Sequence, residues 1–133
     1  MVANGAGIDN GLLTVNGGGW EFYSPAFFPS TVRGAICGIA TLDESELGTT
    51  PVVTFRASAQ DDQELGWVAS TTIDGVRTPT VAGVPIRVPF MVLMSAVVSA
   101  PTVVTVTMSE GRAELASTAF AVRDPIPDAP PAS

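Results

Sequence analysis

Apolar and polar residues alternate in the middle of the chain. In "VVTFRASA" (residues 52–59) every second residue from Val53 onward is apolar, which is the period expected of a half-buried β-strand. After the acidic stretch "DDQELG", the alternation resumes in "WVASTTID" (residues 67–74). The pattern therefore predicts a β-hairpin over residues 52–74 with an acidic turn.

A second hairpin is predicted near the end of the chain. The segment "TVVTVTM" (residues 102–108) alternates with Val104 and Val106 on its inward face, and "AELASTAFAV" (residues 113–122) follows it. The short connection "SEGR" contains Gly111, which can adopt the positive φ that such a turn usually needs.

The region before residue 30 carries two turn signals. Asn10-Gly11 is typical of a type I′ hairpin turn and precedes the short apolar strand "LLTV". The three glycines Gly17 to Gly19 then allow the chain to bulge or bend, so that Trp20 can turn inward.

Two longer segments are apolar on both faces. They are "VRGAICGIATL" (residues 32–42) and "IRVPFMVLMSAVV" (residues 86–98), and this pattern indicates central strands covered on both sides, or a strand that meets a partner. Pro89 implies an edge position or a bulge, because proline cannot donate to a ladder. Helical signals are confined to "LDESELG", where Asp43 or Ser45 can cap a single turn.

These elements predict an all-β fold. Seven or eight short strands at spacings of about 8 to 12 residues are typical of an antiparallel β-sandwich, immunoglobulin-like or jelly-roll in topology. We expect one domain over residues 1–123. The remainder, residues 124–133, is rich in proline and is expected to form a flexible, polyproline-like tail.

Composition narrows the class of partner. The chain has thirteen acidic and six basic residues, contains neither lysine nor histidine, and has a net charge of -7. Nucleic-acid affinity depends on clustered Lys and Arg, so no nucleic-acid partner is expected. Basic residues that are all arginine are also typical of a bacterial genome of high GC content.

Neither a membrane segment nor a disulfide is expected. The N-terminal segment lacks the charged and apolar regions of a signal peptide, and the apolar run from Val84 to Val98 is interrupted by Arg87 and Pro89. The single cysteine, Cys37, lies in the apolar "GAICGIATL" and is predicted to be a small buried residue rather than a reactive thiol. These features predict a cytoplasmic protein with no membrane partner.

The chain lacks the residues that most catalytic sites require. Serine and cysteine nucleophiles generally need a neighbouring base, and zinc sites need clustered Cys and His, yet the chain has one cysteine and no histidine. The glycines of "GAGIDNG" have no helix after them and no lysine, so they predict no phosphate-binding loop. No cofactor is implied.

Carboxylates remain as candidate ligands. Asp61, Asp62 and Glu64 share the predicted hairpin turn, which is either a solvated loop or part of a calcium or carbohydrate site. A calcium site would need further carboxylates from a second loop, namely Asp43, Glu44 and Glu46. A carboxylate-dependent enzyme also remains open, although the spacing indicates no particular catalytic pair.

Aromatic residues cluster between residues 20 and 28. Alternation places Trp20 and Phe22 on one face, which we expect to join the core, with Tyr23 on the other. The following "SPAFFPS" either packs over one end of the sandwich or presents Phe27 and Phe28, with Tyr23, as an exposed contact for another protein or subunit.

The order of "DNGLLTVNGGGWEF", "VRGAICGIAT" and "VTVTMSEGRAELASTAFAVR" resembles a family of small uncharacterised bacterial β-sandwich proteins. The resemblance covers most of residues 8–123. It implies a β-sandwich with a turn, a Gly-Gly-Trp segment and a closing hairpin, and it transfers no activity.

The sequence thus favours a non-enzymatic binding or assembly module. Doubly apolar strands and clustered aromatics suit a protein partner or a homo-oligomer, and a phage or particle component would share these features. The alternative is a calcium- or carbohydrate-binding lectin-like domain, or a carboxylate-dependent enzyme, that uses the acidic loops.

Overall fold

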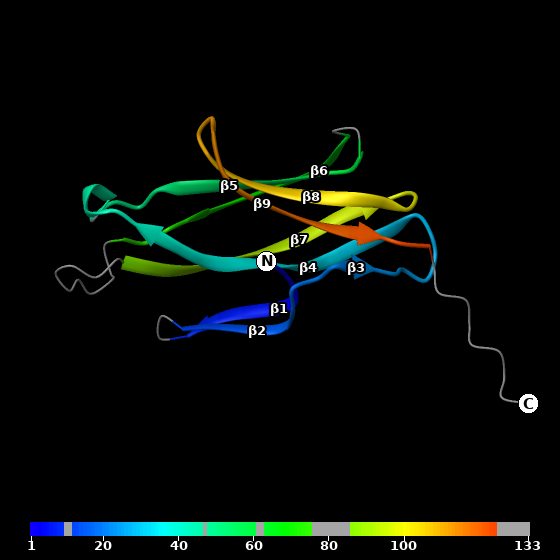
Figure 1. The fold of residues 1–133 in the computed structure, drawn as a ribbon, viewed down its shortest axis with the longest axis horizontal. Helices are drawn as coiled ribbons and strands as arrows, with labels where there is room; N and C mark the ends of the chain where they lie inside the picture. Colours follow the sequence, from blue (N-terminus) through cyan, green and yellow to red (C-terminus); the bar gives the residue numbers. More distant parts are fainter. Residues whose placement is uncertain (10–11, 47, 61–62, 76–85, 125–133) are drawn as a thin grey trace, which may run out of the picture.

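Most of the described residues lie in β-strands (Figure 1). The computed structural model describes residues 1–9, 12–46, 48–60, 63–75 and 86–124. Within them lie nine strands: β1 (Val2–Asp9), β2 (Leu12–Gly18), β3 (Phe22–Tyr23), β4 (Ser30–Leu42), β5 (Val52–Ser58), β6 (Glu64–Thr72), β7 (Ile86–Val98), β8 (Thr102–Glu110) and β9 (Ala113–Val122). The described residues contain no α-helix, and one 3₁₀ turn, η1 (Glu44–Glu46), follows β4.

The strands form two sheets packed against each other. One sheet has the order β2-β1-β4-β7 and the other the order β3-β9-β8-β5-β6 (Figure 1). The predicted all-β sandwich is therefore confirmed. The strand count exceeds the expected seven or eight because the chain before Trp20 forms two strands, β1 and β2, instead of one. The short strand β3 pairs with the end of β9, and this pairing is parallel.

The three predicted hairpins are present. β5 pairs with β6, β8 pairs with β9, and β1 pairs with β2, all antiparallel. Gly111 has a φ of 59°, as its place in the β8–β9 connection requires. The Asn10-Gly11 turn itself lies outside the described residues, and Asp9 pairs with Leu12 on either side of it.

The two segments that are apolar on both faces, residues 32–42 and 86–98, lie in β4 and β7. They pair antiparallel along their full length, from Ser30 opposite Val98 to Leu42 opposite Ile86. β7 is the end strand of its sheet, as Pro89 predicted. It is not a central strand covered on both faces, because Leu93 on its outward side is 72% exposed.

The β1–β2 hairpin accounts for part of the apolar character of β4. β1 and β2 also approach β7, although β4 lies between them in the sheet. On the side of β4 that points away from the core, Ala35 and Cys37 are fully buried. We conclude that the hairpin curls across this side, where it lies below the β4–β7 layer in Figure 1.

The core fills the space between the two sheets. It consists of alternate residues of both sheets, chiefly Val, Ile and Phe: Val2, Val32, Ile36, Leu42, Val53, Phe55, Ala57, Ile73, Ile86, Val88, Val92, Met94, Val98, Val104, Val106, Phe120 and Val122. Burying one such side chain contributes about 1.5–3 kcal/mol, and no polar residue is buried among the described residues.

Two glycines of β4 make room for aromatic rings. A Cβ on Gly34 would lie 2.9 Å from Cη2 of Trp20, and one on Gly38 would lie 2.7 Å from Cζ of Phe90. Trp20 does turn inward after the positive φ angles of Gly17 (57°) and Gly19 (75°). Because glycine has no side chain, each ring packs directly on the backbone of β4.

Two further predictions concern short segments. The single turn expected in "LDESELG" is confirmed as η1, where Glu46 Oε1 accepts a hydrogen bond from the Asp43 N–H at 3.2 Å. The predicted proline-rich tail falls almost entirely on residues 125–133, which lie outside the described residues.

Candidate functional site

Most of the aromatic cluster is used in packing. The Trp20 ring stacks on Tyr23, with 5.5 Å between ring centroids, and meets the edge of Phe120 at 5.4 Å. Its Nε1–H donates to Asn4 Oδ1 at 2.9 Å. Tyr23 and Phe28 pack against the core, whereas Phe27 is 70% exposed. Of the three residues predicted to form an interface, Phe27 is largely exposed, whereas Tyr23 and Phe28 are half-buried.

The predicted inward position of Phe22 is wrong. It was expected to enter the core with Trp20, yet it is 47% exposed and the guanidinium of Arg123 lies 4.0 Å from its ring centroid. The reason is a bend at Glu21, which breaks the period of two before β3 begins. Tyr23 therefore joins Trp20, and Phe22 faces outward beneath a cation–π contact.

A larger apolar surface lies on the side of β4 and β7 that points away from the core. We call it the outer face, and it consists of Thr31, Arg33, Ile39, Thr41, Arg87, Pro89, Met91, Leu93, Ser95 and Val97. Ala35 and Cys37 point to the same side of β4 but are buried. Ile39, Leu93 and Val97 are 59%, 72% and 55% exposed. Exposed aliphatic side chains gathered on one sheet face are typical of an interaction surface.

The outer face carries two positive charges. Arg33 lies opposite Ser95 and Arg87 opposite Thr41, so the two arginines lie on either side of Leu93 and Ile39 along the ladder. Both strands are described in full, and none of their outward residues is acidic. In a chain with a net charge of -7, this face differs in charge from the rest of the molecule.

The outward side of the other sheet is different. There Val68, 54% exposed, lies opposite Arg56, and the neighbouring positions carry hydroxyl groups. Thr54 Oγ1 and Ser70 Oγ, for example, are 3.2 Å apart. Single aliphatic residues among hydroxyl and charged groups are ordinary for a protein surface. Val68 is therefore a suitable control for substitutions on the outer face.

Cys37 is a buried residue, as predicted. It is 0% exposed, and burial raises the pKa of its thiol. A protonated, covered thiol is a poor nucleophile. The alternative of a reactive thiol is therefore wrong for the folded protein.

Labelling with iodoacetamide checks this assignment. We expect Cys37 to resist modification in the native protein at neutral pH and to react fully in denaturant, because the side chain is fully buried in the folded state. Intact-mass spectrometry gives the labelled fraction in each state. Rapid native labelling would contradict the packing of the hairpin on β4.

The acidic residues that the structure describes in these two regions lie apart. Asp61 and Asp62 lie outside the described residues, and Glu64 begins β6 opposite Ser58 at the far end of β5. Asp43 and Glu46 lie at η1, before the other end of β5, and a seven-residue strand separates the two regions by about 20 Å. The expected second loop is therefore too far from Glu64 to complete a calcium site.

The described residues also contain no group of three or more potential metal-ligating side chains. A polar hollow of about 370 Å³ lies between the β5–β6 and β7–β8 connections, lined in part by Gln60, Gln63, Glu64 and Thr102.

Comparison of the chain with protein-family models, with curated proteins and with solved structures finds no match. In the described part of the chain, no helix has the length and apolar character needed to cross a membrane. The outer face and Phe27 are exposed apolar parts of the described surface and are candidates for a contact with another protein.

Proposed function

We propose that this protein is a non-enzymatic binding or assembly module whose main contact surface is the outer face of β4 and β7. The observation that supports the proposal is the exposure of Ile39 and Leu93, 59% and 72%, on the surface of a paired sheet. Covering such side chains removes apolar area from water, at about 25 cal/mol per Å². A partner that excludes water here gains a substantial part of its binding free energy.

The partner that suits this surface is a protein with an apolar centre and acidic residues around it. Arg33 and Arg87 lie on either side of Leu93 and Ile39 and carry the only charges among the outward residues of the two strands. Opposite charge at the rim guides association and discriminates between partners. A second copy would bring its own two arginines and no acid from this face, so a different protein fits better than a face-to-face dimer.

Phe27 is placed to extend the contact. It lies three residues before Ser30, where β4 begins, and therefore at most about 11 Å from the start of that strand. Phe27 is the residue of the predicted aromatic interface whose ring is largely exposed, at 70%. An exposed aromatic ring at the edge of the outer face can bind a pocket on the partner protein.

Membership of the family of small bacterial β-sandwich proteins remains a proposal as well. It is supported by the two packed sheets and by the inward packing of Trp20 after the glycines. It adds no activity to the binding function proposed here.

Substitution of Leu93 tests the proposed surface. Leu93→Glu should leave folding unchanged within about 0.5 kcal/mol, because the side chain is exposed. It should lower partner binding by at least about tenfold, because a charge is introduced at the centre of the contact. Binding is measured by comparing proteins enriched from the source cells with the wild-type and variant proteins as bait.

Val68→Glu is the matched control. Val68 is 54% exposed on the opposite sheet, so the same change there should leave the enriched proteins unaltered. Equal loss with both variants, or with neither, would count against the outer face. Light scattering of the purified chain shows whether a second copy is the occupant instead, because Leu93→Glu would then convert a dimer to a monomer.

A further inference from the structure

The edge of β9 is only partly occupied. β3 pairs with Ala121 and Val122 at the end of β9. There the Ala121 N–H donates to the Glu21 carbonyl and the Arg123 N–H to the Tyr23 carbonyl, both at 2.9 Å. Among the described residues, the earlier part of β9 pairs with β8 on one side and with no strand on the other.

The unoccupied part of this edge can be assigned from the register. Residues two apart in a strand direct their backbone groups to the same edge, so Ser117 and Ala119 face the same side as Ala121. The pairing with β8 is regular from Ala116 to Val122. Free edges are usually protected by charge or proline, yet residues 115–119, "LASTA", contain neither.

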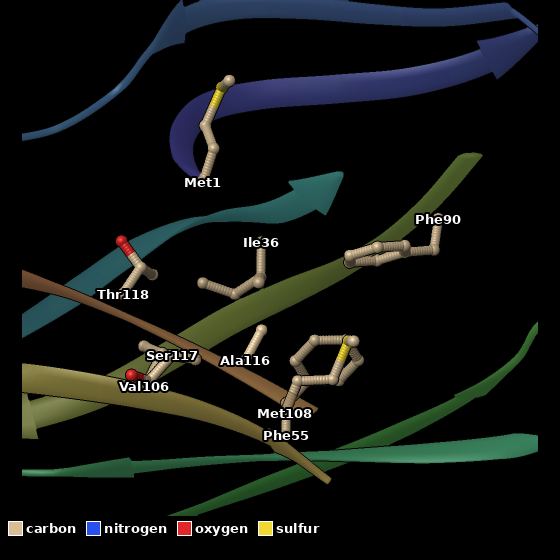
Figure 2. A pocket seen from close by; sticks show the side chains of 9 residues that line it. All are labelled: Met1, Ile36, Phe55, Phe90, Val106, Met108, Ala116, Ser117 and Thr118. Carbon is tan, nitrogen blue, oxygen red and sulfur yellow. The ribbon is translucent and has the colours of Figure 1, made fainter. Parts of the chain in front are cut away.

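An apolar pocket opens beside this edge. Figure 2 shows Ile36, Phe55, Phe90, Val106 and Met108 gathered between the sheets, with residues 116–118 of β9 and Met1 of the N-terminal segment around them. Its volume is about 70 Å³. A single water needs roughly 10–15 Å³ by this kind of measure, and a cavity of about 150 Å³ binds benzene, so the pocket suits one aliphatic side chain.

We propose that the free edge of β9 and this pocket together form a strand-addition site for an extended segment of a partner protein. The segment pairs with the backbone groups of Ser117 and Ala119 and continues the sheet in line with β3. One of its side chains, a Val, Leu, Ile or Met, enters the pocket. Main-chain hydrogen bonds supply affinity in such complexes, and side-chain pockets supply specificity. The site is separate from the outer face and does not depend on the function proposed for it.

A second copy of β9 is a poorer occupant. If β9 of a second copy paired with this edge, the second copy would direct toward the pocket the same residues that line it here, Ala116 and Thr118. Neither is a large aliphatic side chain, so the pocket would stay unfilled. A segment with a longer apolar residue fills it.

The test uses a library of displayed heptapeptides selected on the wild-type protein. The enriched peptides should share one aliphatic position and lack proline beside it. Ser117→Pro removes the N–H that faces the free edge and should weaken binding of an enriched peptide at least about tenfold. Ser117→Ala keeps the N–H and should bind within about twofold of wild type.

A pocket variant tests the side-chain contact without touching the edge. Ala116→Leu places its own aliphatic group at the pocket and should also weaken binding at least about tenfold. Hydrogen exchange should slow at the Ser117 and Ala119 amides of the wild-type protein when peptide is added. Circular dichroism and thermal melting confirm that each variant is folded.

Several results would overturn the proposal. They are enrichment of no peptide, enriched peptides without an aliphatic position, and peptide binding that survives both Ser117→Pro and Ala116→Leu. Conversion of a wild-type dimer to a monomer by Ser117→Pro would instead identify a second copy as the occupant. None of these results bears on the Leu93 surface, whose failure is detected by its own variant.

Discussion

Replacing Phe55 by alanine is expected to lower the free energy of unfolding by about 3–5 kcal/mol. Phe55 is 1% exposed and its ring lies 5.7 Å from that of Phe90, at the point where the two sheets face each other. The substitution loses the transfer free energy of the ring and leaves a cavity that merges with the adjoining apolar pocket of about 70 Å³. Urea denaturation of both proteins gives the difference.

Phe27→Ala is the matched control, because the chemical change is the same at a position that is 70% exposed. We expect this variant to stay within about 0.5 kcal/mol of wild type. A loss in Phe55→Ala no greater than that in Phe27→Ala would mean that the core between the sheets is not packed as described.

Replacing Gly34 by alanine is expected to destabilise the protein by about 1–3 kcal/mol. The added Cβ would lie 2.9 Å from the Ala3 carbonyl oxygen as well as 2.9 Å from Cη2 of Trp20. A backbone oxygen cannot swing aside as the end of a flexible side chain can. Either β1 or the Trp20 ring must therefore shift, which would loosen the contacts of Trp20 with Tyr23 and Phe120.

Gly5→Ala controls for the general effect of adding a methyl group to a strand glycine. Nothing lies within 4 Å of the Cβ position at Gly5, so this variant should be neutral or slightly stabilised. Trp20 fluorescence, measured in a Trp67→Phe background, should change in Gly34→Ala alone. Equal stability of the two variants would contradict the packing of Trp20 on β4.

The strands with one exposed face were predictable from the sequence. β5, β6 and β8 carry the period of two because one side of each faces the core and the other faces solvent, and the second half of β9 does the same. The turn glycines are local signals of the same kind, and Gly111 has the expected positive φ. Local pattern therefore sufficed for these hairpins.

Features that depend on distant parts of the chain were not predictable in the same way. The fit of Trp20 on Gly34 and of Phe90 on Gly38 requires the pairing of strands that lie far apart in the sequence. The bend at Glu21, which exposes Phe22 and turns Tyr23 inward, carries no glycine or proline to mark it. Sequence alternation was wrong there because tertiary packing overrode the local period.

The candidate surface was anticipated only in outline. The two doubly apolar segments suggested a strand that meets a partner, but did not distinguish the residues covered by the β1–β2 hairpin, such as Cys37, from those left exposed, such as Ile39 and Leu93. Two residues of the expected aromatic interface, Tyr23 and Phe28, proved to pack on the core. Separating these groups required the register of β4 with β7 and the path of the hairpin across β4.

Site-specific photo-cross-linking tests the central claim, that the outer face of β4 and β7 is a contact surface for another protein. A benzophenone amino acid is placed at position 93, or at position 68 as the control, and the source cells are irradiated. The account predicts a discrete adduct with an acidic partner from position 93 and none from position 68. Absence of any adduct at position 93, or the same adducts from both positions, would contradict it.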